Sequence, residues 1–268
     1  MQFPFDLTKA KTKVSDDLLE ISLGSEYIAC FGAAKNIATL ESFSNLKSLW
    51  LSGVNEKHAQ RIPTLASVKT LIIHDLRTST LSLIERFPNL ETLLIWGNTK
   101  VTKLTELPSL KRLRVLGLEH FPKVRNIDEI SLLKGLKMLC LTGSVDTALK
   151  FDTLAPLAKL KELELLHITN LDVHDESLEF VKELAALRKL HVSNQFPTIE
   201  YAALKSQCSH VRCNLFVPYI QGGVKCNKCG ALKVMVVGKR KPFVCPACNP
   251  DKLKKYEVEF ETLVENTT

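Results

Sequence analysis

The sequence predicts an α/β solenoid, a stack of about nine similar turns with a parallel sheet on its concave side, followed by a small cysteine-rich module. Two patterns lead to this prediction. The motif LxxLxL, in which x is any residue, recurs between residues 25 and 215 at intervals of 21 to 27 residues, and two CxxC pairs follow within residues 226–248. With 45% hydrophobic and 24% charged residues, the chain has the composition of a folded globular protein.

Each copy of LxxLxL supplies one short strand whose first, fourth and sixth residues face the core. One unit cannot bury its own apolar face, but stacked units bury their faces against one another, so the pattern predicts one continuous core. The fifth unit also has a competing register, Leu110, Leu113 and Val115. The expected core triplets are Ser25, Ile28 and Cys30; Leu46, Leu49 and Leu51; Val68, Leu71 and Ile73; Leu90, Leu93 and Ile95; Leu113, Leu116 and Leu118; Leu136, Leu139 and Leu141; Leu160, Leu163 and Leu165; Leu187, Leu190 and Val192; and Cys208, Val211 and Cys213.

This pattern resembles the leucine-rich repeat, in which each unit contributes one strand and a returning segment. The unit from Ile84 to Leu104 looks like the short class of repeat found in internalins and in a regulatory subunit of protein phosphatase 1. Asn98 matches the buried asparagine of that class, whereas the equivalent places in the other units hold other residues. The resemblance covers about residues 25–215 and implies a curved solenoid with a parallel concave sheet.

The segments between the strands contain proline and charged residues, as in ERFPNLETL and TELPSLKRL, which suits returns that cannot extend the sheet. One of them, residues 175–190 (DESLEFVKELAALRKL), has apolar residues at helical spacing. Asp175 and Glu176 at its start fit the first turn of a helix, where acidic residues are favoured. We therefore expect a helix on the convex face there.

Four cysteines, Cys226, Cys229, Cys245 and Cys248, form two CxxC pairs separated by fifteen residues. Each pair turns two sulfurs toward one point, and two pairs complete a tetrahedral set of thiolates, the ligand set of structural zinc. We therefore expect one structural Zn2+, with all four positions filled by the protein and none left for catalysis. The alternative is a pair of redox disulfides, which a reducing cytosol disfavours.

The module around these cysteines resembles a zinc ribbon. Residues 232–237 (LKVMVV) and 242–245 (PFVC) indicate a hairpin between the cysteine pairs, and residues 255–261 (KYEVEFE) alternate like a third strand. Gly230 and Asn249, which follow the two pairs, suit a left-handed backbone. Because the open end of a repeat stack needs a cap, we expect the ribbon to cover the last repeat, either as a cap alone or as a cap that also binds a ligand.

These patterns divide the chain into four parts: an N-terminal cap over residues 1–24, the solenoid over 25–217, the zinc ribbon and C-terminal cap over 218–264, and a tail over 265–268. The net charge is +1 over residues 1–204, +10 over 205–256 and −4 over 257–268, so the ribbon is strongly basic. Lys239, Arg240 and Lys241, at the expected tip of the ribbon hairpin, are candidate anion-binding residues.

Alternation along each strand places the third, fifth and seventh residues of a unit on the concave face. In the first half of the solenoid these columns gather apolar and aromatic residues, which we expect to form a solvent-facing, partner-binding patch: Trp50, Ile72, His74, Leu94 and Trp96. Two alternatives are that the first thirty residues fold back over this patch, or that the register is one residue off and these side chains are buried. In the second half the face becomes polar and charged, through Glu162, Glu164, Lys189, His191, His210 and Arg212.

A nearly continuous basic row follows the first core residue of each unit. It consists of Lys47, Lys69, Glu91, Arg114, Lys137, Lys161 and Arg188. Lysine is common at this place in leucine-rich repeats, and the resemblance therefore implies a solvated strand edge. The alternative is a rail that binds anions.

Catalytic motifs are absent from the sequence: none of the seven histidines belongs to HExxH or a kinase-like signature, and no nucleophile elbow or glycine-rich phosphate loop occurs. We expect a non-enzymatic protein that recognises another protein, of unknown identity, through its concave face. The alternative function is nucleic-acid or ribonucleoprotein binding through the basic ribbon, with the solenoid as a scaffold. A weaker one, implied by resemblance alone, is a regulatory subunit of an enzyme. Without a leader or a run of about 18 apolar residues, we expect a monomeric cytoplasmic protein that does not associate with membranes.

Overall fold

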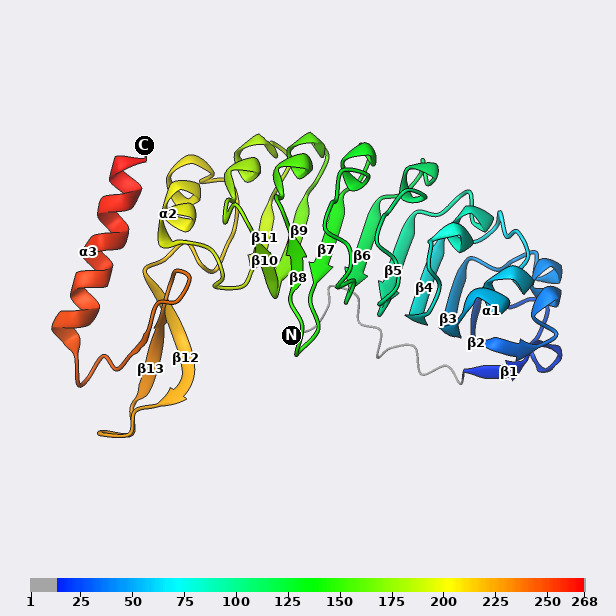
Figure 1. Cartoon of the computed structure of the whole chain (residues 1–268), viewed down its shortest axis with the longest axis horizontal. Helices are drawn as coiled ribbons and strands as arrows, with labels where there is room; N and C mark the ends of the chain where they lie inside the picture. Colours follow the sequence, from blue (N-terminus) through cyan, green and yellow to red (C-terminus); the bar gives the residue numbers. More distant parts are fainter. Residues whose placement is uncertain (1–13, 268) are drawn as a thin grey trace.

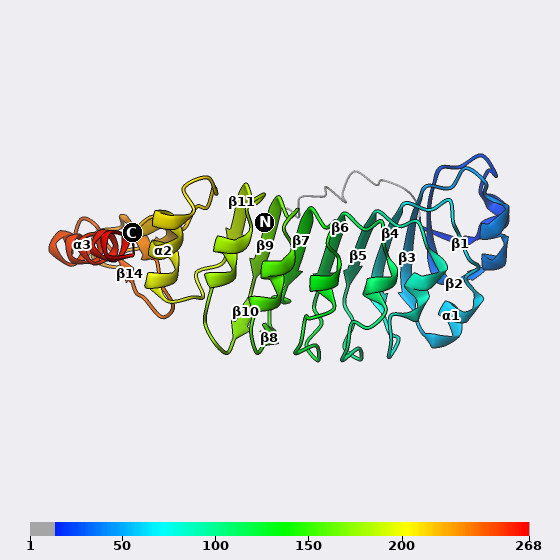
Figure 2. The same cartoon turned by 90° about the horizontal axis from the view of Figure 1, so that it is seen from above.

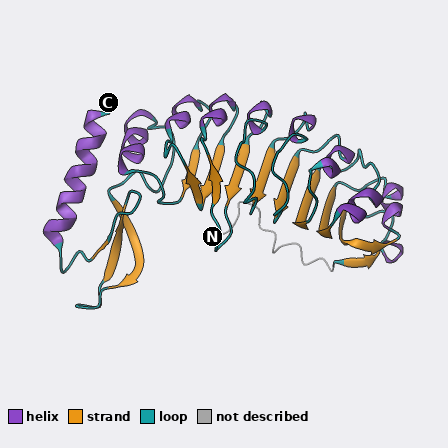
Figure 3. Cartoon of the chain, viewed as in Figure 1, coloured by secondary structure: helices purple, strands orange, loops and turns teal. Residues whose placement is uncertain are grey.

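The computed structural model describes residues 14–267, which form one curved stack (Figure 1). Strands line the concave side of the stack, and short helices line its convex side (Figure 3). A small module with a long helix lies at the C-terminal end. The N-terminal cap expected over residues 1–24 falls only partly within the described residues.

The concave side is a parallel sheet of nine strands, which Figure 2 shows side by side along the long axis. Eight of the strands belong to predicted repeats, and β1 precedes them. The ninth predicted unit adds only a single bridge, between Lys189 and Arg212. In sheet order the strands are β1 (Ser15–Asp17), β2 (Tyr27–Lys35), β3 (Ser48–Val54), β4 (Thr70–Leu76), β5 (Thr92–Trp96), β6 (Val115–Glu119), β7 (Met138–Thr142), β9 (Leu165–Thr169) and β11 (Lys189–Val192).

The core runs through the stack as one cluster, because the same position of each repeat pairs with that of the next. Leu49 pairs with Leu71, Leu71 with Leu93, and Leu93 with Leu116. All four side chains are buried. The last pairing confirms the main register of the fifth unit and excludes the competing one. The chain therefore folds as a leucine-rich-repeat solenoid.

The register of the repeat that contains β9 differs from the prediction. Its core triplet is Leu163, Leu166 and Ile168, three residues later than expected, because Leu166 pairs with Leu139. Two overlapping copies of the motif begin at Leu160 and Leu163, and burial cannot distinguish them because both leucines are fully buried. The residues that make the stretch before β9 longer than predicted include strand β8 (Leu149–Phe151). This strand pairs in parallel with β10 (Leu171–Val173).

The convex returns are mostly single turns of 3-10 helix, because their apolar residues recur at every third position. Leu178, Val181, Leu184 and Leu187 are all buried, which matches the three-residue period of a 3-10 helix. The helix expected over residues 175–190 is therefore reduced to a short 3-10 turn. The returns are η2 (Leu18–Glu20), η3 (Ile37–Ser42), α1 (Glu56–Arg61), η4 (Ser82–Arg86), η5 (Leu107–Ser109), η6 (Ile130–Leu132), η7 (Ala155–Lys159), η8 (Glu179–Glu183) and α2 (Thr198–Gln207).

The C-terminal module is a three-stranded antiparallel sheet followed by a helix. Its elements are β12 (Tyr219–Lys225), β13 (Leu232–Val236), β14 (Phe243–Val244) and α3 (Pro250–Asn266). The predicted hairpin between the cysteine pairs is present as β13 and β14, but the third strand expected over residues 255–261 is wrong, because that segment lies within α3.

Helix α3 forms because its apolar residues also have helical spacing. Pro250 occupies the first turn, where its fixed φ is already helical. Leu253 and Phe260, seven residues apart, are both buried. A strand would have placed Val258 on the same face as Phe260, whereas Val258 is 54% exposed. Within residues 14–267, no helix is both long and apolar enough to cross a membrane.

Candidate metal centre and concave surface

The four cysteines of the two CxxC pairs come together in space. Their sulfur atoms all lie within 4.8 Å of one another, with 3.9 Å between Cys226 and Cys248 and 3.5 Å between Cys229 and Cys245. Four thiolates bound to zinc at about 2.3 Å stand about 3.8 Å apart in a tetrahedron. The spacing therefore fits a tetrahedral metal ion and is far longer than the roughly 2.05 Å of a disulfide bond.

Backbone hydrogen bonds shape the two cysteine turns. In the first, Cys226 N donates to Ala231 O at 2.8 Å, and Gly230 N donates to Cys226 O at 2.9 Å. Gly230 has a φ of +75°, the left-handed conformation expected there. Asn249 in the second turn differs from the expectation, with a φ of −139°. It precedes Pro250, and a residue before proline is disfavoured in the helical region of the backbone.

The same turns favour thiolates. The backbone N–H groups of Lys228 and Cys229 donate to the Cys226 sulfur and lower its pKa to about 6. The neighbouring thiols, with Cys229 foremost, raise the pKa of Cys248, because clustered sulfurs cannot all ionise without a counter-charge. A divalent cation among the four sulfurs would supply that charge. A closed set of four thiolates would leave it no open coordination position.

The loop between β13 and β14 attaches the module to the last repeat. Asn194 Nδ2 donates to Val236 O at 2.9 Å, and Gly238 N donates to Asn194 Oδ1 at 2.6 Å. Lys239 N donates to Phe196 O at 2.7 Å. Each contact joins the ribbon to the segment between β11 and α2, so the module packs directly against the end of the solenoid.

The candidate anion-binding residues lie in this loop. Lys239, Arg240 and Lys241 are at the tip of the hairpin, but the tip contacts the rest of the protein. Lys239 forms an ion pair with Glu176 of the solenoid, and Lys241 forms one with Glu259 of α3 at 2.7 Å. Two of the three side chains are therefore already neutralised by carboxylates.

Trp50, His74 and Trp96 lie together on the concave face, across β3, β4 and β5. The ring centroids of Trp50 and Trp96 are 6.3 Å apart with planes at 85°, and those of His74 and Trp96 are 6.2 Å apart. Strands β3 and β5 are second neighbours, about 9.6 Å apart at a spacing of about 4.8 Å per strand. The two indoles therefore lean toward each other over β4.

Ile72 and Leu94, expected to face solvent, are instead 8% and 1% exposed. Their register is as predicted, since Ile72 pairs with Trp50 on one side and with Leu94 on the other. Ile72 lies on the strand that the two indoles span, and Leu94 is its neighbour in the sheet. These two side chains form the floor of the patch, beneath Trp50 and Trp96. The alternative in which the first thirty residues cover the patch falls partly on residues 1–13, outside the described residues.

The second half of the concave face carries a histidine pair that the sequence analysis missed. In the corrected register His167 takes the place expected for Glu164 and pairs with His191. The two rings stack with centroids 4.5 Å apart. Burial lowers the pKa of His167 to about 4, so this ring is neutral near pH 7. The overlapping motif that begins at Leu163 is the sequence feature that identifies this position.

The basic row is part of a ladder of ion pairs along the edge of the sheet. Lys47 pairs with Glu26 at 2.6 Å, and Lys137 pairs with Glu164 at 2.9 Å. Exposed pairs of this kind stabilise a protein little, but they neutralise the row. This supports the solvated edge over the anion-binding rail. Lys69 pairs with Glu91 and Arg114 with Glu162 along the same edge. In the corrected register Glu164 takes the place of Lys161 in this row, and Lys161 lies outside it, paired with Glu183.

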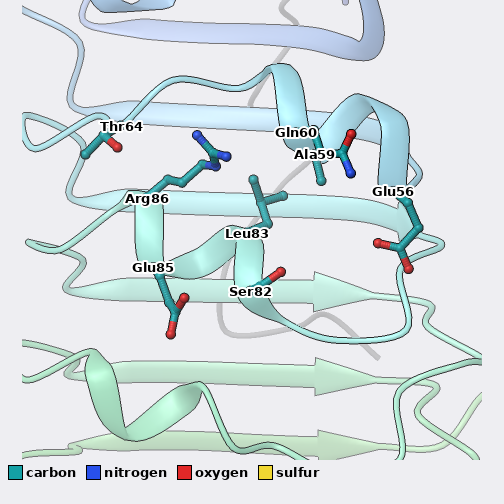
Figure 4. Close-up of a pocket in the computed structure, with 8 residues that line it drawn as sticks. All are labelled: Glu56, Ala59, Gln60, Thr64, Ser82, Leu83, Glu85 and Arg86. Carbon is teal, nitrogen blue, oxygen red and sulfur yellow. The ribbon is translucent and has the colours of Figure 1, made fainter.

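A pocket of about 350 Å³ lies on the convex face between α1 and η4 (Figure 4). Glu56 Oε1 accepts hydrogen bonds from Ser79 N at 2.7 Å and Ser79 Oγ at 2.9 Å, which lower the pKa of Glu56. This carboxylate therefore links two repeats. No histidine or cysteine is among the lining residues, which are Glu56, Ala59, Gln60, Thr64, Ser82, Leu83, Glu85 and Arg86.

No family model matches the chain, and no curated protein matches it. Among solved structures, it is similar to two internalins of Listeria monocytogenes. One, inlF, is 15% identical with a TM-score of 0.46, and the match covers 69% of this chain and 66% of that one, just under two thirds of its length. The other, inlC2, is 17% identical with a TM-score of 0.41, over 63% of this chain and 77% of that one. These are likenesses of fold.

Proposed function

We propose that this protein recognises another protein through the concave face of its solenoid and performs no catalysis itself. The observation that carries the proposal is the contact between Trp50 and Trp96, the two tryptophans of the chain. Both side chains are partly exposed and lie on the concave face, outside the leucine core. Tryptophan is among the residues most enriched in binding hot spots.

The patch has the arrangement of a small hot spot. Its floor, Ile72 and Leu94, is apolar and buried; its walls are the two indoles; and exposed His74 provides a polar rim. A large apolar side chain of a partner would displace water from the indole faces. Desolvated aromatic contacts of this kind supply much of the binding free energy of protein interfaces.

We further propose that the four cysteines hold one structural zinc ion. The soft thiolate donors, the sulfur spacing and the closed coordination shell all favour zinc. Its role would be to hold the module, from residue 218 onward, that caps the solenoid of residues 25–217. The hydrogen bonds from the β13–β14 loop to Asn194 and Phe196 support this capping role.

Nucleic-acid binding through the ribbon is the less favoured function, because Lys239 and Lys241 already pair with carboxylates. We place the protein in the cytoplasm, as a monomer without membrane association. The support for this location is chemical: the two CxxC pairs need reduced sulfurs to bind a metal, and thiols persist in a reducing compartment.

The test is partner capture from native cell extract on immobilised, metal-loaded protein, with and without nuclease. We expect Trp50→Ala/Trp96→Ala to keep its fold and to raise the Kd for a nuclease-resistant protein partner at least ~30-fold, or about 2 kcal/mol. The control, Leu132→Ala/Ile199→Ala, trims two exposed convex side chains, 57% and 45% exposed, and should bind normally. Undiminished capture by the tryptophan variant would refute the proposal, whereas loss of every partner to nuclease would favour nucleic acid.

A further inference from the structure

Two cationic side chains project side by side at the C-terminal end of the concave face. Lys189 of β11 pairs with Arg212, which places Arg212 at the third position of its unit rather than the expected fifth. Both residues are exposed, and with His191, Asn214 and Phe216 they help to line a pocket of about 670 Å³. At the third position the other paired repeats carry uncharged residues: Tyr27, Ser48, Thr70, Thr92, Val115, Met138 and Leu165.

This pair differs from the cations of the edge ladder, which have carboxylate partners. Among residues 14–267, neither Lys189 nor Arg212 forms an ion pair. Like charges at paired positions of a sheet repel each other. Burial and the charge of Lys189 also lower the pKa of neighbouring His191, so its ring adds no positive charge near pH 7. An anionic group bound between Lys189 and Arg212 would relieve the repulsion.

We propose that the concave face binds an extended acidic segment of the partner protein, with carboxylates on Lys189 and Arg212 and an apolar side chain on Trp50 and Trp96. This inference rests on the proposed function and specifies the chemistry of the partner. The planar guanidinium group of Arg212 can donate two hydrogen bonds to one carboxylate, and Lys189 provides a second cation beside it. From β4 to β11 there are five strand steps, about 24 Å, which about seven extended residues span.

An acidic protein segment fits this face better than a nucleic acid does. A phosphate backbone carries a charge at every nucleotide and needs cations along its whole path. Between the two sites the described concave positions offer none, and Glu119 would repel phosphate. These positions are Gly117, Glu119, Cys140, Thr142, His167 and Thr169.

Selection from a random twelve-residue peptide library displayed on phage tests the inference without a known partner. With metal-loaded protein as bait, we expect enriched peptides to carry Asp or Glu about seven residues from Trp, Phe or Leu. Lys189→Gln/Arg212→Gln should lose the acidic enrichment and keep the apolar one, and Trp50→Ala/Trp96→Ala should do the reverse. The control, Lys161→Gln/Arg188→Gln, removes the same charge outside the concave columns and should select the same peptides as the wild type.

Fluorescence anisotropy with the most enriched peptide, and with its Gln-for-Glu and Asn-for-Asp analogue, then measures the effect. Two exposed ion pairs predict that Lys189→Gln/Arg212→Gln raises the Kd about 2- to 30-fold, less at high salt. Selection without acidic enrichment, or equal binding of the two peptides, would overturn the inference. The proposed function would survive if the tryptophan variant still lost its native partner. Tighter binding of a 20-nucleotide single-stranded RNA, lost in the same variant, would assign the pair to phosphate and also overturn the inference.

Discussion

Removing two of the proposed metal ligands should loosen the C-terminal repeats and leave the N-terminal repeats intact. Cys226→Ser/Cys229→Ser leaves half of the ligand set. The module then loses the free energy of structural zinc binding, about 10–16 kcal/mol in small zinc domains. Its own hydrophobic core is too small to replace that stabilisation. The buried residues of this core are Val234, Val236, Val244 and Leu253.

The size of the effect follows from the contacts that the loop makes. Residues 236–239 form two hydrogen bonds with Asn194 and one each with Phe196 and Thr198. At about 0.5–1.5 kcal/mol per bond, together they stabilise the last repeat by about 2–6 kcal/mol. Because 1.4 kcal/mol is a factor of ten, amide hydrogens that depend on these contacts should exchange roughly 30- to 20,000-fold faster once the loop detaches.

Hydrogen exchange read by mass spectrometry checks this prediction. Exchange should accelerate over residues 187–213 and stay slow over residues 46–95, because each repeat contacts only its neighbours. Elemental analysis should find about one zinc per wild-type chain and none in the variant. Lys228→Ser, an exposed non-ligand position between the two cysteines, is the matched control. Equal acceleration along the whole stack would refute the capping argument, and zinc retained by the variant would place its ligands elsewhere.

Single substitutions test the register, the first cysteine turn and the anchoring loop. Leu116→Ala leaves a cavity at a fully buried site and should lower the free energy of unfolding by about 2–5 kcal/mol. The control Val115→Ala, at a partly exposed position, should lower it by less than about 1 kcal/mol. Urea unfolding that gave the opposite order would support the competing register. Gly230→Ala adds a Cβ at a φ of +75° and should destabilise the turn by about 1–2 kcal/mol. The variant should therefore lose its metal to a chelator more readily than the wild type. Equal metal retention by the two proteins would contradict the turn geometry. Hydrogen bonding by Lys239 lowers the pKa of Glu176 below 4.5, so this contact stabilises the fold above that pH and is lost as the pH falls through the lowered pKa. Melting temperatures of Lys239→Met and wild type should therefore differ at pH 7 and converge as the pH is lowered through the pKa of Glu176, and a gap that persisted in strong acid would count against the ion pair.

The solenoid was predictable because one requirement, burial of three positions in every strand, repeats along the chain. The same regularity caused the error at β9. Leu154, Leu157, Leu160, Leu163 and Leu166 follow one another at three-residue intervals and are all buried. A spacing of three suits both the 3-10 return and the first half of LxxLxL, so the motif overlaps itself. Only pairing with the neighbouring strand fixes where the return ends and the strand begins.

The C-terminal module shows which contacts a local pattern can predict. The sulfurs of the two CxxC pairs converge because each turn positions its own two ligands. The segment VEFE (residues 258–261), in contrast, fits both the alternation of a strand and the spacing of a helix. Pro250 and Leu253, which precede it, favour the helix. The ion pair between Lys239 and Glu176 joins residues 63 positions apart. This ion pair depends on how the module packs against the solenoid, which a local sequence motif does not predict.

The two ends of the stack are closed by unequal means within residues 14–267. At the first end, three-residue β1 pairs with β2, and Leu19 and Leu23 beside it are 70% and 61% exposed. The other end carries α2, α3 and the cysteine module. A linear array opens from its weaker end, so proteases should enter at β2 before they reach β9. The tryptophan patch spans β3 to β5, beside that weak end. An occupied patch would hold these strands together, so the lifetime of the protein against proteolysis would depend on whether its partner is present.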